Sequence, residues 1–286
     1  MNPPVCNSLA STHPRQNYLL AALPDLAWIC WQPYLEPLEV PLGKVLCHSG
    51  GLTDYVYFPT TAIISLTNTT KDGDSSEIAV VGNDGVVGIG LIMGGNSMPS
   101  QAVVQSAGTV YRLRSQVVKT ELGRAGPVLS LLLRYTQSVI SQLTLSAACN
   151  RHHSIDQQLA RRLLVAMDRS ASGELAMTQE LAASLIGVRR EGITNAALKL
   201  QQAGVIRYGR GQISVLNRAG LEKRTCECYG AAKRETERLL PMMPSLYATP
   251  EASPASATPS NSVTASSSAT LSKQALAEPF ILTVAA

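Results

Sequence analysis

The chain has 286 residues, of which 45% are hydrophobic, and it carries a formal net charge of +4. This apolar content is enough to bury a core, so a chain that is disordered throughout is excluded. No apolar run approaches the roughly 20 residues that a membrane-spanning helix needs, and Met1–Ala10 lacks the pattern of a secretory signal. Six scattered cysteines in a chain of this size read as reduced thiols, so we expect a cytoplasmic protein.

The first half of the chain predicts a short helical segment at about 16–31 and then an all-β region over 38–114. In that region short apolar runs alternate with turns rich in Gly and Asp, a pattern typical of β-hairpins. Closely spaced short strands favour a sandwich or jelly roll. The runs are Lys44–Cys47, Tyr55–Phe58, Ala62–Thr69, Ser75–Val81, Ala102–Ser106 and Thr109–Arg114.

The hydrophobic period changes after Gly126, where Pro127 suits the first position of a helix. Apolar and small residues then recur at spacings of three and four, which predicts a helix of about 22 residues. Leu131 and Tyr135 form a second apolar set, so the helix can pack on its own domain and on a partner chain. Burial in a single core is the alternative. The expected dimer-interface residues are Leu129, Leu132, Thr136, Val139 and Leu143.

Positive charge gathers in residues 151–238, which contain 15 Lys and Arg against 9 Asp and Glu. One basic block in an otherwise nearly neutral chain is expected of a domain that meets a polyanion. Near the start of this block, Ser154 and Gln157 are spaced as a capping box at the start of a helix. The loop Ser170–Gly173 is expected to end that helix.

Residues 177–216 predict a helix, a glycine turn, a second helix and a small β-hairpin. Thr178 can cap the first helix, and Gly187 suits a tight turn with positive φ. The second helix is expected from about Arg189 to Ala203, with Gly204 at its end. Arg, Glu and Asn cluster at its start, and these side chains read base edges in the major groove. Turn, wing and charge together favour DNA binding over an ordinary charged helix face.

The stretch Met177–Asn195, with the sequence MTQELAASLIGVRREGITN, resembles the helix-turn-helix of the Crp/Fnr regulators. The order of parts over residues 17–225 is also similar. The resemblance implies an α+β fold: a double-stranded β-helix (jelly roll) sensor domain at 17–125, a dimerisation helix at 126–150 and a winged helix-turn-helix at 151–225. It implies a homodimeric, non-enzymatic transcription regulator that binds double-stranded DNA and RNA polymerase, with a small-molecule effector as an open possibility.

Individual positions carry the resemblance further. Arg190 and Glu191 match the base-reading pair of the family, whereas Asn195 stands where some members have another Arg. Thr178 and Gln179 match residues that contact the DNA backbone. The complete set expected to contact DNA is Thr178, Gln179, Arg189, Arg190, Glu191, Thr194, Asn195, Lys199, Arg207 and Arg210.

The sensor domain departs from members that bind cyclic AMP. Those members have Glu after a glycine and Arg before Ser or Thr, whereas here Ile89 follows Gly88 and the stretch Met98–Ala102 contains no Arg. A cyclic phosphate needs a cation or several amide donors, so we expect no response to cyclic AMP. The glycines are either turns or amide donors for another anion. The candidate effector pocket is Gly82, Gly85, Gly88, Ile89, Ser100 and Gln101.

Other sites find less support in the sequence. Cys226 and Cys228 are too close for a zinc knuckle and have no obvious partner pair, so no metal or cofactor is expected. His152 and His153 are expected in a polar hinge, with a pH or metal switch as the alternative. Residues 241–286 are a low-complexity tail that we expect to be disordered. A second hypothesis remains: a ligand- or protein-binding β-roll tethered to DNA by a largely non-specific winged helix.

Overall fold

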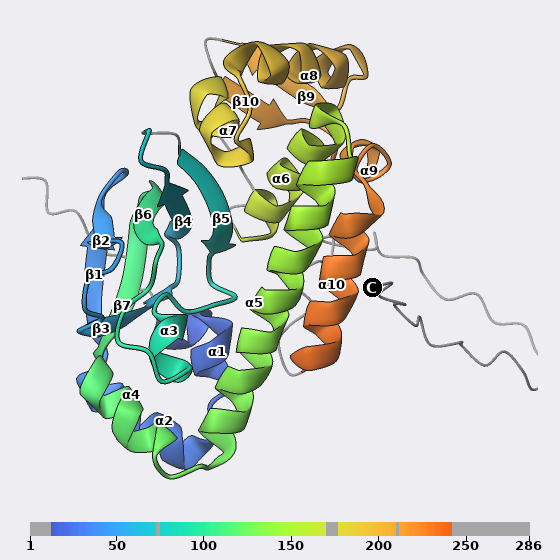
Figure 1. The fold of residues 1–286 in the computed structure, drawn as a ribbon. Coiled ribbons are helices and arrows are strands. Elements are labelled where there is room, and N and C mark those ends of the chain that lie inside the picture. Colours follow the sequence, from blue (N-terminus) through green and yellow to red (C-terminus); the bar gives the residue numbers. More distant parts are fainter. Residues whose placement is uncertain (1–12, 73–74, 170–176, 210–211, 242–286) are drawn as a thin grey trace, which may run out of the picture. The chain divides into compact units, whose positions relative to one another are not determined.

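The computed structural model describes residues 13–72, 75–169, 177–209 and 212–241 (Figure 1). Two antiparallel sheets form a β-roll, with strand orders β1-β7-β3 and β2-β6-β4-β5. This arrangement confirms the jelly-roll expectation. The strands are β1 (Glu36–Val40), β2 (Val45–Cys47), β3 (Tyr55–Pro59), β4 (Ile63–Thr69), β5 (Ser75–Val81), β6 (Gln101–Ser106) and β7 (Gly108–Arg114).

Each strand run expected from the sequence is present, and the structure adds β1. The sequence Glu-Pro-Leu-Glu-Val of β1 contains a proline, which cannot donate a ladder hydrogen bond. It is tolerated because β1 lies at a sheet edge and pairs with β7 alone, with Leu38 opposite Val110. An edge position of this kind cannot be inferred from the local pattern.

The short helices lie around the β-roll. The segment expected at 16–31 is divided into α1 (Tyr18–Ala21) and α2 (Asp25–Trp31), with Pro24 between them. Asn17 fixes this segment, because its buried side chain accepts from two amides of α1 and donates to the carbonyls of Pro59 and Gly85. The remaining short elements are η1 (Pro14–Gln16), η2 (Gln32–Tyr34), α3 (Ile89–Ile92) and α4 (Ser115–Leu122).

The long helix expected after Gly126 is α5 (Pro127–His152), with Pro127 in its first turn as predicted. Its inward face joins the largest apolar cluster through Leu131 and Tyr135. The predicted dimer face is wrong at two positions, because Leu132 is 2% exposed and Thr136 is 5% exposed within the same chain. Side chains buried in their own chain have no area left for a partner. Val139 also packs against this cluster.

The basic domain is built from helices around a small sheet. The capping box predicted at Ser154 and Gln157 is confirmed. The loop expected at Ser170–Gly173 lies outside the described residues. The elements are α6 (Ile155–Asp168), β8 (Met177–Thr178), α7 (Gln179–Ile186), α8 (Arg190–Gln202), β9 (Ile206–Gly209), β10 (Gln212–Val215) and α9 (Arg218–Glu222).

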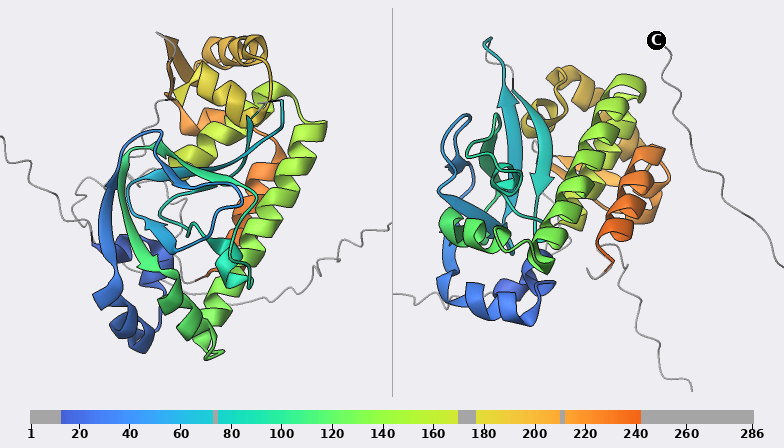
Figure 2. Two further views of the ribbon diagram at one scale, coloured as in Figure 1. Left: turned by 60° about the vertical axis from the view of Figure 1, so that its left-hand side comes forward. Right: turned by 60° about the horizontal axis from the view of Figure 1, so that its bottom comes forward.

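A further helix, α10 (Glu227–Leu239), was not expected from the sequence. It runs beside α5, as Figures 1 and 2 show from different sides. The hydroxyls of Ser138 on α5 and Thr236 on α10 are hydrogen-bonded at 3.0 Å, and Leu239 and Leu240 join the apolar cluster that holds α5. One face of α5 is therefore covered by its own chain. The expected tail lies outside the described residues from position 242 onward.

Candidate nucleic-acid interface

The turn between α7 and α8 has the geometry that the sequence predicts. The Thr178 hydroxyl caps α7 by accepting from the Leu181 amide at 3.1 Å. Gly187 ends that helix with φ of 76°, a left-handed conformation that side chains with a Cβ rarely adopt. Gly204 likewise has a positive φ of 70° just after α8. These residues hold α8 at the end of a tight turn.

The start of α8 presents a polar, exposed face. Arg189 is the N-cap residue, and Arg190 and Glu191 occupy the first turn. These three side chains and that of Asn195, one turn further on, are exposed. A helix end with free backbone amides adds a positive partial charge to the two guanidinium groups. This surface can therefore meet both phosphates and base edges.

Two of the expected contact residues are instead used inside the domain. Gln179 is 2% exposed, and its side-chain oxygen accepts from the Thr194 hydroxyl at 3.2 Å. The carbonyl of Arg190, 3.0 Å from the same hydroxyl, is the alternative acceptor for its single proton. The Gln179 side chain therefore joins α7 to α8 through Thr194, and a DNA contact at Gln179 stays a prediction that would fall to its backbone amide. Such a tie keeps the two helices in a fixed relation.

The β-hairpin after α8 is confirmed and gains a third strand, because β10 pairs with both β8 and β9. Arg207 is exposed on β9, and Arg210 lies outside the described residues. Lys199 contacts Asp156 at 3.4 Å, an exposed ion pair of little energetic weight. Arg207 and Lys199 thus extend the basic surface beyond the start of α8.

Part of the positive charge that stood out in the sequence does not face solvent. Arg169 pairs with Asp84 at 2.8 Å, and each side chain is only about a tenth exposed. Two further buried carboxylates have arginine partners in the same way, in the pairs Arg162 with Glu77 and Arg218 with Asp168. The charge count therefore overstates the positive surface that can face DNA, because these arginines are paired with buried carboxylates. The polar residues at the start of α8 are exposed and can face it.

Comparison with known families matches both halves of the chain. Residues 37–124 match the family model of the cyclic nucleotide-binding domain, and residues 157–224 match that of the Crp-like helix-turn-helix domain. Together the two matches cover more than half of the chain. This pairing decides the assignment. The chain belongs to the Crp/Fnr family of transcription regulators.

Solved structures show the same fold. FixK2 from Bradyrhizobium japonicum is 18% identical, with a TM-score of 0.58 over 67% of this chain and 98% of its own. A putative Crp/Fnr regulator from Eubacterium rectale is 17% identical, with a TM-score of 0.59 over 73% and 98%. The c-di-GMP-responsive regulator CLP of Xanthomonas campestris is 13% identical, with a TM-score of 0.53 over 68% and 99%. A search of curated protein sequences gives no match.

The glycines of the expected effector pocket have packing roles in this Crp/Fnr protein. A Cβ added to Gly82 would lie 2.6 Å from the Cβ of Arg169, and one added to Gly85 would collide with the Tyr135 hydroxyl. Gly88 has φ of 108° and precedes α3. The first two glycines thus let a loop of the β-roll approach α6 and α5.

The other residues of that predicted pocket have different surroundings. Ile89 lines a small cavity beside Tyr135, and Ser100 is buried just before β6. Gln101 is half-buried in β6 opposite Thr67 of β4. Whether these residues meet an effector stays a prediction.

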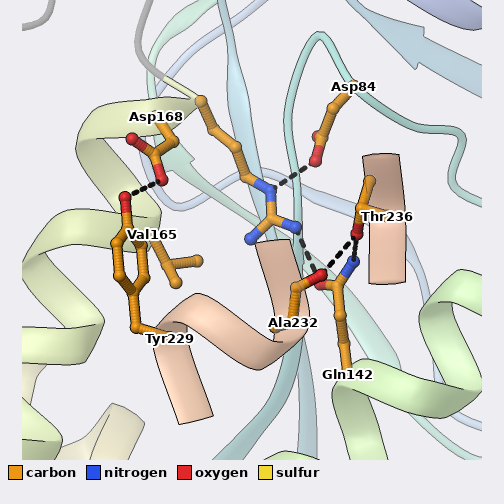
Figure 3. Close-up of a pocket in the computed structure, with 8 residues that line it drawn as sticks. Asp84, Gln142, Val165, Asp168, Tyr229, Ala232 and Thr236 are labelled. Carbon is orange, nitrogen blue, oxygen red and sulfur yellow. Dashed lines mark hydrogen bonds and ion pairs between the residues drawn. The ribbon is translucent and has the colours of Figure 1, made fainter. Parts of the chain in front are cut away.

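A polar cavity lies where α5, α6, α10 and the loop before α3 meet (Figure 3). Arg169 donates to Asp84 at 2.8 Å and to Gln142 at 2.9 Å, and Tyr229 donates to Asp168 at 2.9 Å. The cavity holds about 20 Å³, which is room for about one water molecule. Its charged groups therefore serve one another rather than a ligand of nucleotide size.

One expectation about the cysteines is wrong. Cys226 and Cys228 do have a partner pair, because the fold brings Cys149 and His153 to them. The sequence signal for this partner pair is the spacing of Cys149 and His153. They are four residues apart at the end of one helix, so their side chains lie on the same face. Separately, no helix among the described residues is long and apolar enough to span a bilayer.

Proposed function

We propose that this Crp/Fnr protein is a homodimeric cytoplasmic regulator that recognises a two-fold symmetric DNA site through α8 and does not respond to cyclic AMP. The observation that carries DNA recognition is the exposed cluster of Arg189, Arg190, Glu191 and Asn195 at the start of α8, beyond a glycine turn. Arg can bond guanine with two donors and Glu can accept from cytosine, so this set suits the major groove.

The dimer proposal uses the face of α5 that its own chain leaves open. Leu133 and Ile140 are 49% and 43% exposed, and Gln137, Thr144 and Ala147 are exposed in line with them. These five positions recur at alternating spacings of four and three, which is the seam of a coiled coil. A second copy of α5 would bury this seam, and two recognition helices would then meet successive major grooves about 34–36 Å apart.

Selection of bound sequences from random DNA by the purified protein tests the proposal. A palindromic consensus with a sharp footprint is expected. Uniform coating of any DNA that weakens steeply with salt would instead favour the tethering hypothesis, because phosphate contacts alone are unspecific and salt-dependent.

Replacing Arg190 with Ala should weaken binding to the selected site by about 1–3 kcal/mol and relax the preference at one base pair in each half-site. The reason is the loss of a two-donor contact to a base edge. Fluorescence anisotropy with the selected site and its single-base variants measures this. Arg124→Ala, an exposed arginine outside the winged domain, is the matched control and should bind normally. An equal loss on selected and random DNA would mean that Arg190 contacts a phosphate.

Calorimetry with cyclic AMP is expected to detect no binding at physiological concentrations. Ile89 packs against the apolar cluster where a ribose-binding Glu would be needed, and Ser100 is buried where the phosphate-binding Arg would be needed. Without either group a cyclic phosphate has no charged partner on these segments. An affinity in the micromolar range would contradict this expectation.

A further inference from the structure

Three cysteines and one histidine meet where α5 ends and α10 begins; we call Cys149, His153, Cys226 and Cys228 the Cys3His cluster. Cys149 lies in the last turn of α5 and His153 follows that helix, whereas Cys226 and Cys228 open α10. Their ligand atoms all lie within 4.8 Å of one another. The three cysteines are buried and His153 is half-buried. Four nitrogen and sulfur donors in one place is the ligand set of a structural zinc site.

The distances within the Cys3His cluster fit a single metal ion. The sulfurs of Cys149 and Cys226 are 3.5 Å apart, and the sulfur of Cys228 is 3.7 Å from Nδ1 of His153. Zinc–sulfur bonds of about 2.3 Å in a tetrahedron place two sulfurs about 3.8 Å apart. A disulfide would need about 2.05 Å. A 4Fe–4S cluster would hold its four ligands farther apart, because each attaches to a different iron atom, and a 2Fe–2S cluster would divide them into two pairs on separate iron atoms.

A neighbouring carboxylate orients the histidine. Nε2 of His153 is 3.1 Å from a carboxylate oxygen of Glu227. With the proton on Nε2, that nitrogen donates to Glu227, and Nδ1 directs its lone pair toward the sulfurs. Histidines that bind a metal commonly donate their second N–H to a carboxylate in this way. Glu227 is therefore a positioning residue rather than a ligand.

The surrounding charges also suit a cation held by thiolates. The carboxyl end of α5 carries a negative partial charge that favours a cation, and the amino end of α10 favours thiolates. Three thiolates with one divalent ion leave a net charge of −1. Burial raises the pKa of the Cys149 and Cys228 thiols, and the positive charge of Arg161 opposes that rise.

We propose that the Cys3His cluster binds one zinc ion per chain. The helices and strands of the winged domain, from α6 to α9 (155–222), lie along the chain between the two ligand pairs. A zinc ion would tie both ends of that domain to the end of α5 and hold α10 against it. His153 would thus be part of a fixed joint at the position where the sequence suggested a hinge.

Metal analysis of the full chain tests this directly. Protein purified under reducing conditions without a metal-affinity column should contain about one zinc per chain, as measured by inductively coupled plasma mass spectrometry. After removal of zinc with a chelator, cobalt(II) should restore the complex. It should show the strong visible absorption of a tetrahedral site and thiolate-to-cobalt charge transfer. Neither measurement uses DNA, so its failure is distinct from failure of the DNA-binding proposal.

Substitutions assign the ligands. The double variant Cys226→Ser/Cys228→Ser should lose the bound zinc, whereas Cys30→Ser, an exposed cysteine on α2, should retain it. His153→Ala should weaken zinc binding, and His152→Ala, its exposed neighbour, should not. Glu227→Ala should lower zinc affinity about 10- to 100-fold while keeping the cobalt spectrum tetrahedral.

Zinc content and the cobalt spectrum of the unsubstituted protein test the proposal even if a variant does not fold. Protein that contains no zinc and gives only the weak absorption of octahedral cobalt would overturn it. A Cys149–Cys226 disulfide in protein that contains no zinc as isolated, and that binds none when zinc is supplied after reduction, would also overturn it. That result would identify the pair as a redox site instead.

Discussion

Replacing Ile140 with Glu is expected to convert the proposed dimer into a folded monomer. Ile140 is 43% exposed at the middle of the open seam of α5, so a charge there is tolerated in a single chain. In a two-fold interface the substitution occurs twice, and two carboxylates would face each other in a seam of low dielectric constant. Sedimentation velocity measures the mass, and far-UV circular dichroism measures the helix content.

The matched control is Ile29→Glu, which places the same charge at an exposed isoleucine of α2. This variant should remain a dimer. A dimeric Ile140→Glu protein would refute the proposed seam, and an unfolded one would show that α5 needs Ile140 for its own packing.

The Ile140→Glu variant should also distinguish the affinity for a complete palindrome from the affinity for a single half-site. Affinity for the palindrome should fall far more than affinity for a single half-site. A dimer binds both half-sites with one loss of translational freedom, which a monomer cannot do. Anisotropy titrations with the full site and with one half-site measure the difference. Equal losses on the two DNAs would mean that α8 itself has been disturbed.

Replacing Leu132 with Ala is expected to cost about 2–5 kcal/mol of unfolding free energy, because it leaves a cavity in the cluster that joins α5 to the β-roll. Leu132 is 2% exposed within one chain, so the loss should appear in the monomer. We would measure urea unfolding in the Ile140→Glu background, where unfolding is not coupled to dissociation.

Leu133→Ala is the control in that background, since Leu133 is 49% exposed and should change monomer stability little. In the dimer the order should reverse, with Leu133→Ala weakening association more than Leu132→Ala. If Leu132→Ala left the monomer unchanged and weakened the dimer, the original interface expected from the sequence would be restored.

Local patterns were sufficient where neighbours along the chain determine the structure. The turn at Gly187, the cap at Thr178 and the capping box at Ser154 depend on residues within a few positions, and the structure has all three. The strand runs and the long helix followed from periods of two and about 3.6 residues. The exposed face at the start of α8 followed in the same way, because capping and amphipathic spacing set which side chains point outward.

Only the tertiary structure decided which part of the protein each side of a helix contacts. The stripe containing Leu132 and the seam containing Leu133 both carry large apolar side chains, and they differ in whether the β-roll of the same chain covers those side chains. Gln179 has the polarity of a phosphate contact, yet it is buried against Thr194. Helix α10 has few apolar residues, and its place along α5 depends on contacts with distant parts of the chain.

The Cys3His cluster is the clearest example of the difference between what the sequence determines and what the tertiary structure determines. Cys226 and Cys228 are two residues apart, and that spacing by itself argues against zinc. Cys228 lies 75 residues from His153 along the chain, and the two are brought to 3.7 Å by the packing of α10 on α5. Sequence determines the type of each ligand and its place on a helix. Folding alone determines which ligands share a site, because contacts between distant segments depend on the packing of the whole chain.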